Sequence, residues 1–266
     1  MDLGLRGRVA LVAAASKGLG RAVAEEFARE GAKVAMCSRE EAAITKAAED
    51  IARSTGSKTT LPVAADLSTR EGCETFVQTA HAAHGTIDIL FVNAGGPPPG
   101  RFDDLGDEAW AKAFELTLMS AVRLTRLVLP YMRAQKSGSI VYSTSTTLRQ
   151  PTQALNLILS NALRSSVHGM AKTLSADLAK DGIRVNAVQP GRIETDRLVQ
   201  IDTDNARRQG TTPDEIRKRV EAGIPLGRYG KPAEFAAVAV FVASPRASYL
   251  TGVSIQVDGG MLPSPF

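Results

Sequence analysis

The chain has 266 residues, of which 44% are hydrophobic and 23% are charged. This composition is too apolar for a disordered chain and is typical of a globular protein with a buried core. The net charge of +4 comes from basic residues mixed with acidic ones, without a run of five like charges, which argues against a nucleic-acid-binding protein.

The cysteines and the N-terminal segment indicate in which cellular compartment the protein is expected. Cys37 and Cys73 lie in unrelated contexts, which fits a reducing environment and offers no metal-binding spacing. The apolar run from Val9 to Ala15 is too short to span a membrane, and no signal-peptide cleavage pattern follows it. We therefore expect a soluble cytoplasmic protein with no membrane or nucleic-acid partner and no metal.

Short apolar runs alternate with longer amphipathic patterns along the chain. The short runs predict strands, and the patterns with a helical period predict helices. In chain order the expected elements are strand 9–15, helix 20–31, strand 33–38, helix 40–54, strand 60–65, helix 69–84, strand 88–95, helix 107–134, strand 137–145, helix 153–180, strand 184–191, helix 232–243 and strand 253–260.

The strands are apolar on both faces, which indicates a parallel sheet covered by helices on both sides. Because crossover connections are right-handed, the expected fold class is α/β with a doubly wound, seven-stranded parallel sheet. The sequence contains no internal repeat and no linker. We therefore expect residues 1–266 to form a single domain.

Two segments, 95–106 and roughly 192–229, fit neither pattern. The second is long and charged, with a short helix expected near 213–222. Irregular segments of this length are often active-site lids, so 192–229 is expected to cover a substrate site.

Three consecutive prolines, Pro97 to Pro99, interrupt the first irregular segment. Proline lacks a backbone donor, which excludes a helix or a central strand there. Residues 95–100 follow the fourth strand at the sheet edge where ligands bind. They form either the roof of a ligand pocket or a plain rigid loop.

The first strand runs into the turn Ala14-Ala15-Ser16-Lys17-Gly18-Leu19-Gly20 and then into a helix. Glycine allows the backbone to approach a pyrophosphate, and the helix N-terminus offers unpaired N–H groups. A structural turn also uses glycine. Its placement after the first strand of a doubly wound sheet nevertheless favours a Rossmann-type dinucleotide-binding domain.

Four further stretches strengthen this interpretation: Ala65-Asp66-Leu67, Asn93-Ala94-Gly95, VNAVQPG at 185–191 and VDGG at 257–260. In order and spacing the chain resembles the short-chain dehydrogenase/reductase family, especially members similar to 3-oxoacyl-(acyl carrier protein) reductase. The resemblance extends over about residues 6–260. It implies an NAD(P)-dependent oxidoreductase that reduces a small carbonyl compound or oxidises an alcohol.

The resemblance also implies cofactor contacts, although each position has an alternative role in a turn or in the core. Expected beside the diphosphate are Gly18, Leu19 and Gly20; beside the adenine, Asp66 and Leu67; beside the ribose, Asn93, Ala94 and Gly95; and around the nicotinamide, Pro190, Gly191, Ile193 and Thr195. Ser16 and Lys17 complete the turn. The family's first turn glycine is Ala14 here, and its methyl group narrows the turn.

The second strand indicates the type of dinucleotide. NAD enzymes of this architecture usually place a carboxylate just after this strand, to accept from the ribose 2′-hydroxyl. Here the strand ends Cys37-Ser38-Arg39, and Glu40 and Glu41 follow. Arg39 and Lys17 can pair with a 2′-phosphate, so NADP is favoured over NAD.

Members of the family use a tyrosine as proton donor or acceptor, a lysine four residues later, a serine and an asparagine. Counting from the motif at 182–186, the tyrosine position is Ser160 and the lysine position is Arg164. The serine position is Ser145, with Ser143 one register away, and the asparagine position is Thr117. Only the serine matches, and no tyrosine elsewhere is followed by lysine at the fourth residue.

This substitution changes the chemistry. An aliphatic hydroxyl is a far weaker acid than a phenol, and arginine stays protonated, so neither Ser160 nor Arg164 replaces the usual proton donor. Arg164 can still stabilise an oxyanion or bind ribose hydroxyls. Losing a general acid costs about 10²- to 10⁴-fold in rate, so slow hydride transfer remains possible with water as the proton relay.

Three functions stay open. The first is an NADP-dependent carbonyl reductase or alcohol dehydrogenase in which Ser145, Ser160, Arg164 and Thr117 form the site. The second is a cofactor- or ligand-binding protein without turnover, such as a sensor or an inactive subunit. The third is a non-redox enzyme that uses Arg164 as an anion clamp.

Other polar residues are expected to play smaller parts. His81 and His84 fit an exposed helix face better than a metal site, and His168 is either structural or near Arg164. Five arginines in the expected lid suggest an anionic substrate: Arg192, Arg197, Arg207, Arg208 and Arg217. The nearby aspartates weaken this suggestion, because they reduce the net positive charge: Asp196, Asp202, Asp204 and Asp214. The resemblance suggests a homotetramer or a homodimer, with helices 107–134 and 153–180 between subunits.

Overall fold

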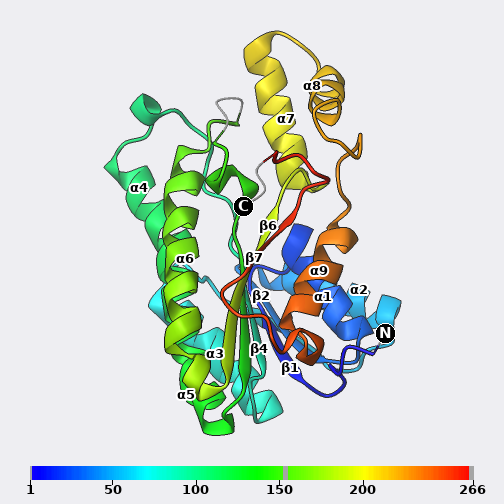
Figure 1. Cartoon of the computed structure of the whole chain (residues 1–266), viewed down its shortest axis with the longest axis vertical. Helices are drawn as coiled ribbons and strands as arrows, with labels where there is room; N and C mark the ends of the chain where they lie inside the picture. The colour runs from blue at the N-terminus through cyan, green and yellow to red at the C-terminus, as the bar shows by residue number, and fades with distance from the viewer. Residues whose placement is uncertain (1, 152–154, 264–266) are drawn as a thin grey trace.

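The computed structural model describes residues 2–151 and 155–263 and contains one seven-stranded sheet (Figure 1). All strand pairs are parallel, in the order β3-β2-β1-β4-β5-β6-β7. The strands are β1 (Val9–Val12), β2 (Lys33–Ser38), β3 (Thr60–Ala64), β4 (Ile89–Val92), β5 (Gly138–Ser143), β6 (Ile183–Pro190) and β7 (Ser254–Val257). This arrangement confirms the expected fold class.

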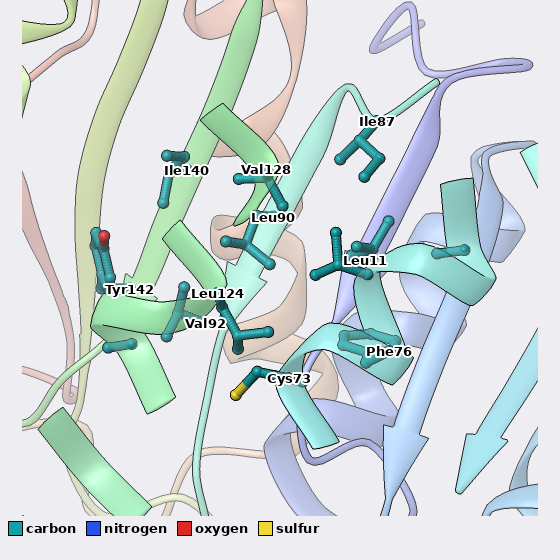
Figure 2. Packing of buried hydrophobic residues seen from close by; sticks show 14 of the residues in the cluster. Leu11, Cys73, Phe76, Ile87, Leu90, Val92, Leu124, Val128, Ile140 and Tyr142 are labelled. Atoms are coloured by element: carbon teal, nitrogen blue, oxygen red, sulfur yellow. The ribbon is translucent and has the colours of Figure 1, made fainter. Parts of the chain in front are cut away.

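Helices cover both faces of the sheet and build two hydrophobic cores. One face carries α1 (Gly18–Arg29), α2 (Glu41–Thr55) and α9 (Pro232–Ala243), and the other carries α3 (Arg70–His84), α5 (Ser120–Gln135) and α6 (Ile158–Asp177). Figure 2 shows part of the second core, where Leu124 of α5 and Phe76 of α3 pack with the strand residue Leu90. Burial of apolar surface on both faces explains why the strands read as continuous hydrophobic runs.

Several predicted strands are too long at their C-terminal ends. Strand β1 stops at Val12 because Ala14 turns to a left-handed φ of 51°. Strand β7 stops at Val257, before Gly259 and Gly260, whose φ angles are 66° and 83°. The apolar or motif residues that follow each strand look like strand residues in sequence. Their backbones, however, no longer pair with a neighbouring strand.

The predicted helix 107–134 is not regular throughout. It consists of α4 (Asp107–Phe114), a π-helical segment at Glu115–Met119 and α5, which is continuous with it. π-Helical turns are uncommon and are often found at functional sites. The expected site residue Thr117 lies in this segment.

The predicted helix 153–180 begins later than expected. Helix α6 starts at Ile158 and ends at Asp177, and the predicted start at 153 lies outside the described residues. Ser160 therefore belongs to the first turn of α6. Short 3₁₀ segments also occur at Phe102–Asp104, Thr146–Leu148, Ala179–Asp181 and Pro245–Ala247.

The expectation of a mostly irregular segment at 192–229 is wrong. Two helices occupy it, α7 (Asp196–Gln209) and α8 (Pro213–Glu221), and only the second was predicted. The buried face of α7 contains Asp202 and Asn205 beside Leu198, Ile201 and Ala206, so its apolar periodicity is broken by polar residues. Both helices project beyond the carboxyl ends of the strands, at the top of Figure 1.

The chain reverses its direction of strand addition between β1 and β4. After β1 it builds β2 and β3 outward, and it then returns to place β4 on the other side of β1. In doubly wound sheets, ligands bind at this switch point, outside the carboxyl ends of the strands. Within the described parts of the chain, the helices all lack the combined length and apolar character that crossing a membrane requires.

Candidate functional site

The glycine turn after β1 is tightly constrained. A side chain on Gly20 would place its Cβ 2.3 Å from the Ala14 carbonyl oxygen, so only glycine fits there. Gly18 has a φ of 59°, which also favours glycine. Ala14 adopts a left-handed φ of 51° with a methyl group, at the position where the resemblance led us to expect a narrowed turn.

Asn93 links the two sides of the switch point. Its side-chain nitrogen donates to the Ala14 carbonyl over 3.4 Å, from the end of β4 to the end of β1. Ala94 and Gly95 follow directly, and the space where a side chain on Gly95 would lie is open. The expected ribose-binding residues therefore border the crevice between β1 and β4.

Asp66 organises the end of β3. Its carboxylate accepts hydrogen bonds from the Ser68 backbone nitrogen at 3.0 Å and from the Ser68 hydroxyl at 2.8 Å. Leu67 beside it is buried in the core. Asp66 therefore holds a turn at the same edge of the sheet as the glycine turn.

Two cations lie exposed at the tips of neighbouring strands. Lys17 follows β1, and Arg39 follows β2. A hydrogen bond of 2.8 Å from the Ala15 nitrogen to the Cys37 oxygen joins these two strand ends. In the described chain neither cation forms an ion pair with a carboxylate.

The segment after β6 closes against the glycine turn. A side chain on Gly191 would place its Cβ 2.5 Å from Cβ of Asp258, so the close approach to β7 requires glycine. Thr195 caps α7 by accepting from the Leu198 nitrogen at 3.3 Å. Its methyl carbon lies 3.6 Å from the position that a Cβ on Gly18 would occupy. Pro190, buried Ile193 and Thr195 thus flank the crevice from the β6 side.

Ser160 and Arg164 meet on one face of α6, as their spacing predicts. Arg164 Nε donates to the Ser160 hydroxyl over 3.2 Å. The rest of the guanidinium reaches the strand ends: Nη1 donates to the Ser143 carbonyl over 2.7 Å, and Nη2 donates to the Ala94 carbonyl over 3.4 Å. Arg164 therefore joins α6 to the carboxyl ends of β4 and β5.

No carboxylate balances this charge in the described residues, since every acceptor of Arg164 is a hydroxyl or a main-chain carbonyl. Removal of water from the guanidinium lowers the pKa of Arg164 to about 10, and repulsion from Arg197 adds to this effect. Arg164 remains a cation at neutral pH. It can stabilise negative charge but cannot act as a proton donor near pH 7.

Ser145 has partners that the sequence did not indicate. Its hydroxyl lies 2.8 Å from the Thr147 hydroxyl and accepts from the Thr147 nitrogen over 3.2 Å. The Thr147 hydroxyl in turn donates to the Asn161 side-chain oxygen over 2.7 Å. Because Thr147 gives its proton to Asn161, Ser145 is the donor to Thr147. Asn161 follows Ser160 in α6, so hydrogen bonds connect Ser145 to the helix that carries Ser160.

Several buried polar atoms near these residues have no hydrogen-bond partner in the described structure: Thr117 Oγ1, Thr144 Oγ1 and both side-chain atoms of Gln189. Thr144 and Gln189 follow the paired residues Ser143 and Val188, so they share the sheet face that α5 and α6 cover. Gln189 was not predicted as a site residue. Its place in the VNAVQPG stretch, at the end of the sixth expected strand, was the available signal.

The four tyrosines occupy other parts of the molecule. Tyr142 is fully buried and shares a hydrogen bond of 2.6 Å with Thr125, while Tyr131 stacks on His81 at 4.1 Å between ring centroids. Tyr229 donates to Asp202 over 2.9 Å, and Tyr249 is fully exposed beyond α9. No phenol takes the place of Ser160 among these described contacts.

In the described structure, the side chains of His168 and His81 make their contacts with residues other than Arg164. His168 faces Ser254 of β7, at 3.4 Å from Nδ1 to the hydroxyl. Burial lowers the pKa of His168 and of His84, with help from neighbouring cations. Among the residues that the structure describes, histidine, cysteine and carboxylate side chains do not gather into a metal-binding group.

Comparisons with known proteins agree with this geometry. The family profile described as enoyl-(acyl carrier protein) reductase matches residues 13–262. The chain is 34% identical to 3-oxoacyl-(acyl carrier protein) reductase FabG of Thermotoga maritima over 263 residues, which cover 97% of this chain and 99% of the relative.

Solved structures share the fold over nearly the full length. L-Sorbose reductase from Gluconobacter frateurii, solved with NADPH and L-sorbose, is 34% identical with a TM-score of 0.92, over 99% of this chain and all of that one (100%). An actinorhodin polyketide ketoreductase solved with NADPH is 30% identical with a TM-score of 0.90, over 96% of this chain and 97% of that one. The chain therefore belongs to the short-chain dehydrogenase/reductase family of oxidoreductases.

Proposed function

We propose that the protein is an NADPH-dependent carbonyl reductase, also able to run as an alcohol dehydrogenase, whose site uses Ser160 and Arg164 where relatives use tyrosine and lysine. The observation that carries this proposal is the position of Arg164, a cation enclosed at the ends of β4 and β5 without a carboxylate partner. A fixed positive charge at that point can stabilise the oxyanion that forms when a carbonyl is reduced.

The residues at the crevice fit a phosphorylated dinucleotide. Gly18 and Gly20 keep side chains out of the turn before α1, and the helix N-terminus presents unpaired N–H groups. Lys17 and Arg39 lie at adjacent strand ends and are free to pair with a 2′-phosphate. The NADPH complexes of two similar reductases support the same cofactor. The methyl group of Ala14 opposes a close fit and is expected to weaken binding.

NADPH would supply the hydride in this reaction. The chain's own residues would orient and polarise the carbonyl: Ser145 through its hydroxyl, and Arg164 through its charge. Ser160, bonded to Arg164 Nε, would lie nearest the reacting oxygen. Asn93, Ala94 and Gly95 would support the ribose, and Asp66 and Leu67 the adenine. Pro190, Gly191, Ile193 and Thr195 would flank the nicotinamide.

A proton must come from another source, because Ser160 is a weak acid and Arg164 remains charged. Thr117, Thr144 and Gln189 offer buried polar atoms without protein partners. Such atoms are where ordered water binds in protein interiors. We infer that water bound there relays the proton, and that turnover is slow as a result.

A second function has one observation in its favour. The donors of Arg164 and the hydroxyl of Ser145 are already engaged by protein groups. A site that is internally satisfied in this way fits a family member that binds the dinucleotide as a sensor or an inactive subunit, with little or no turnover.

Two measurements on the purified protein test these alternatives: the rate of NADPH oxidation with a panel of ketones, and the binding of NADPH and NADH. The reductase proposal expects slow NADPH oxidation that falls at least tenfold in Arg164→Ala. Tight NADPH binding without oxidation by any ketone would favour the binding protein. Failure to bind either NADPH or NADH would contradict both and favour a non-redox enzyme with Arg164 as an anion clamp.

The lid and the assembly complete the proposal. Residues 192–229, with α7 and α8, would cover the substrate from above the strand ends. The exposed face of α6 carries small residues such as Ala162, Ser165 and Gly169, which allow a second subunit to pack closely. We expect a homotetramer or a homodimer through α5 and α6, measurable by light scattering on the eluted protein.

A further inference from the structure

Two arginines from different helices converge on the loop that follows β4. Arg164 of α6 donates to the Ala94 carbonyl over 3.4 Å, and Arg197 of α7 donates to the Pro97 carbonyl over 2.6 Å. Their acceptors are three residues apart in the chain. The two guanidinium groups lie close enough that the charge of Arg197 lowers the pKa of Arg164.

Neither arginine forms an ion pair with a carboxylate in the part of the chain that the structure describes. Burial also lowers the pKa of Arg197, and Asp204, two turns along α7, attracts its charge only from a distance. Two like charges held together in a partly dry site repel each other, and a bound anion relieves that repulsion.

Three other lid arginines differ from Arg197 in this respect. Arg192 pairs with Asp202, Arg207 with Asp204, and Arg217 with Glu194 and Glu221. Two of the aspartates named from the sequence, Asp202 and Asp204, and the glutamates Glu194 and Glu221 therefore neutralise these three arginines. They leave Arg197 without a neutralising partner, directly above the crevice.

A buried polar group fixes the helix that carries Arg197. Asp202 is 3.2 Å from Arg192 and accepts a hydrogen bond of 2.9 Å from the Tyr229 hydroxyl. Both charged side chains of this pair are at most 8% exposed. These contacts fix α7 about one turn beyond Arg197. The position of Arg197 beside the loop after β4 is therefore set by the fold.

The loop leaves room for a ligand beside the two arginines. The position that a side chain on Gly95 would occupy has no atom within 4 Å. A Cβ on Gly96 would lie 3.2 Å from Arg197 Nε, so glycine at 96 lets the guanidinium reach the loop. The open space at Gly95 therefore lies between Ala94 and Pro97, the two residues whose carbonyls Arg164 and Arg197 hold.

We infer that Arg164 and Arg197 together bind an oxyanion group of the substrate, so that the preferred substrates are carbonyl compounds carrying a carboxylate or a phosphate. This inference rests on the proposed function for the reacting carbonyl, but the anion site itself does not depend on turnover. Arg197 would leave the Pro97 carbonyl and turn its planar fork to the anion. Arg164 would add a second positive charge from the side of the sheet, at the ends of β4 and β5.

Matched pairs of compounds test the inference. Acetoacetate against methyl acetoacetate, and dihydroxyacetone phosphate against dihydroxyacetone, differ mainly in charge. The wild type is expected to prefer at least one anionic member of a pair in kcat/KM. Arg197→Gln should lower that preference about 10- to 100-fold, the effect of losing a charge-assisted hydrogen bond. Arg197→Lys should lose less, because it keeps the charge.

The control is Arg207→Gln, on the same helix, whose side chain is 79% exposed and pairs with Asp204 at 3.8 Å. It should leave the preference unchanged. A wild type that uses neutral and charged members equally would overturn the inference. So would an Arg197→Gln variant that keeps the preference but binds NADPH more weakly, because the anion would then be the cofactor diphosphate.

The same variants separate this inference from the proposed function. If no carbonyl compound is reduced, the proposed function fails, and binding is measured directly. Acetoacetate or dihydroxyacetone phosphate should then raise the melting temperature of the wild type and of Arg207→Gln but not of Arg197→Gln. Equal shifts in all three proteins, or none in any, would refute the anion site.

Discussion

Arg164 donates from Nε to the hydroxyl of Ser160 over 3.2 Å, one helical turn away. The same guanidinium reaches the carbonyl oxygens at the ends of β4 and β5. Ser160 and Arg164, which we propose take the places of the family's tyrosine and lysine, therefore form one hydrogen-bonded unit at the strand ends. Under the proposed function, the site keeps its position in the fold and uses different acid–base chemistry.

The double variant Ser160→Tyr, Arg164→Lys should restore a proton donor. A positioned general acid contributes about 10²- to 10⁴-fold to a rate, so we expect kcat for NADPH oxidation to rise roughly tenfold or more. Ser160→Tyr alone should show part of this gain, because Arg164 also places a cation beside the phenol, whereas Arg164→Lys alone should show none, because it adds no phenol. Circular dichroism checks that the larger side chain is accommodated. A folded double variant no faster than the wild type would contradict the proposed origin of slow turnover.

Asp202→Asn should destabilise the fold around α7. The substitution leaves the charge of Arg192 buried without its partner, at 8% exposure, and such losses cost about 3–5 kcal/mol. Urea unfolding measures the change in the free energy of unfolding. The matched control is Asp204→Asn, whose pair with Arg207 is exposed and should change stability by no more than about 0.5 kcal/mol. Equal effects of the two substitutions would show that the buried pair does not anchor the lid.

Two substitutions in the glycine turn should affect dinucleotide binding in opposite directions. Ala14→Gly removes the methyl group held at a φ of 51°, so NADPH should bind severalfold more tightly. Gly20→Ala would place a Cβ 2.3 Å from the Ala14 carbonyl and should weaken binding at least tenfold or prevent folding.

Fluorescence titration with NADPH reads out this prediction. Glu49→Ala, on the exposed face of α2, is the control, and it should leave NADPH affinity unchanged. If Ala14→Gly binds NADPH no better than the wild type, the turn does not limit cofactor binding.

Stability should fall in mild acid. Burial first, and then Arg149 and Lys172, lower the pKa of His168 below its usual value of 6.5, and burial and Lys33 do the same for His84. Below pH 6.5 the unfolded chain therefore takes up protons more readily than the folded protein, and the free energy of unfolding decreases.

Melting curves between pH 7.5 and 5 measure this effect, before the carboxylates titrate. The variant His84→Gln, His168→Gln should lose less stability over this range than the wild type does. An identical slope in both proteins would assign the acid sensitivity to other groups.

Local patterns in the sequence determined most of the fold. Buried runs of apolar residues gave the strands, and the glycine turn, the NAG stretch and the VQPG stretch placed the crevice at the switch point. The spacing of Ser160 and Arg164 also predicted their contact, because residues four apart share one helix face. Such features depend on neighbours in sequence, so sequence is enough to find them.

Helix α7 shows where that reasoning stops. Its buried face contains Asp202, whose burial is stabilised by Arg192 and Tyr229, residues on either side of the helix in sequence. The spacing of apolar residues cannot predict that a charged residue will be buried on a helix face. The same holds for Ser145, whose partners Thr147 and Asn161 became visible only when β5 and α6 were placed together.

The chemistry of the site was decided by the tertiary structure. Sequence placed Arg164 and five lid arginines in the chain, but only the structure separates those that carboxylates neutralise from Arg197, which has no such partner. The acceptors of Arg164 lie 21 and 70 residues away. Charge balance depends on distances through space, and in a folded chain these are set by packing rather than by order along the sequence.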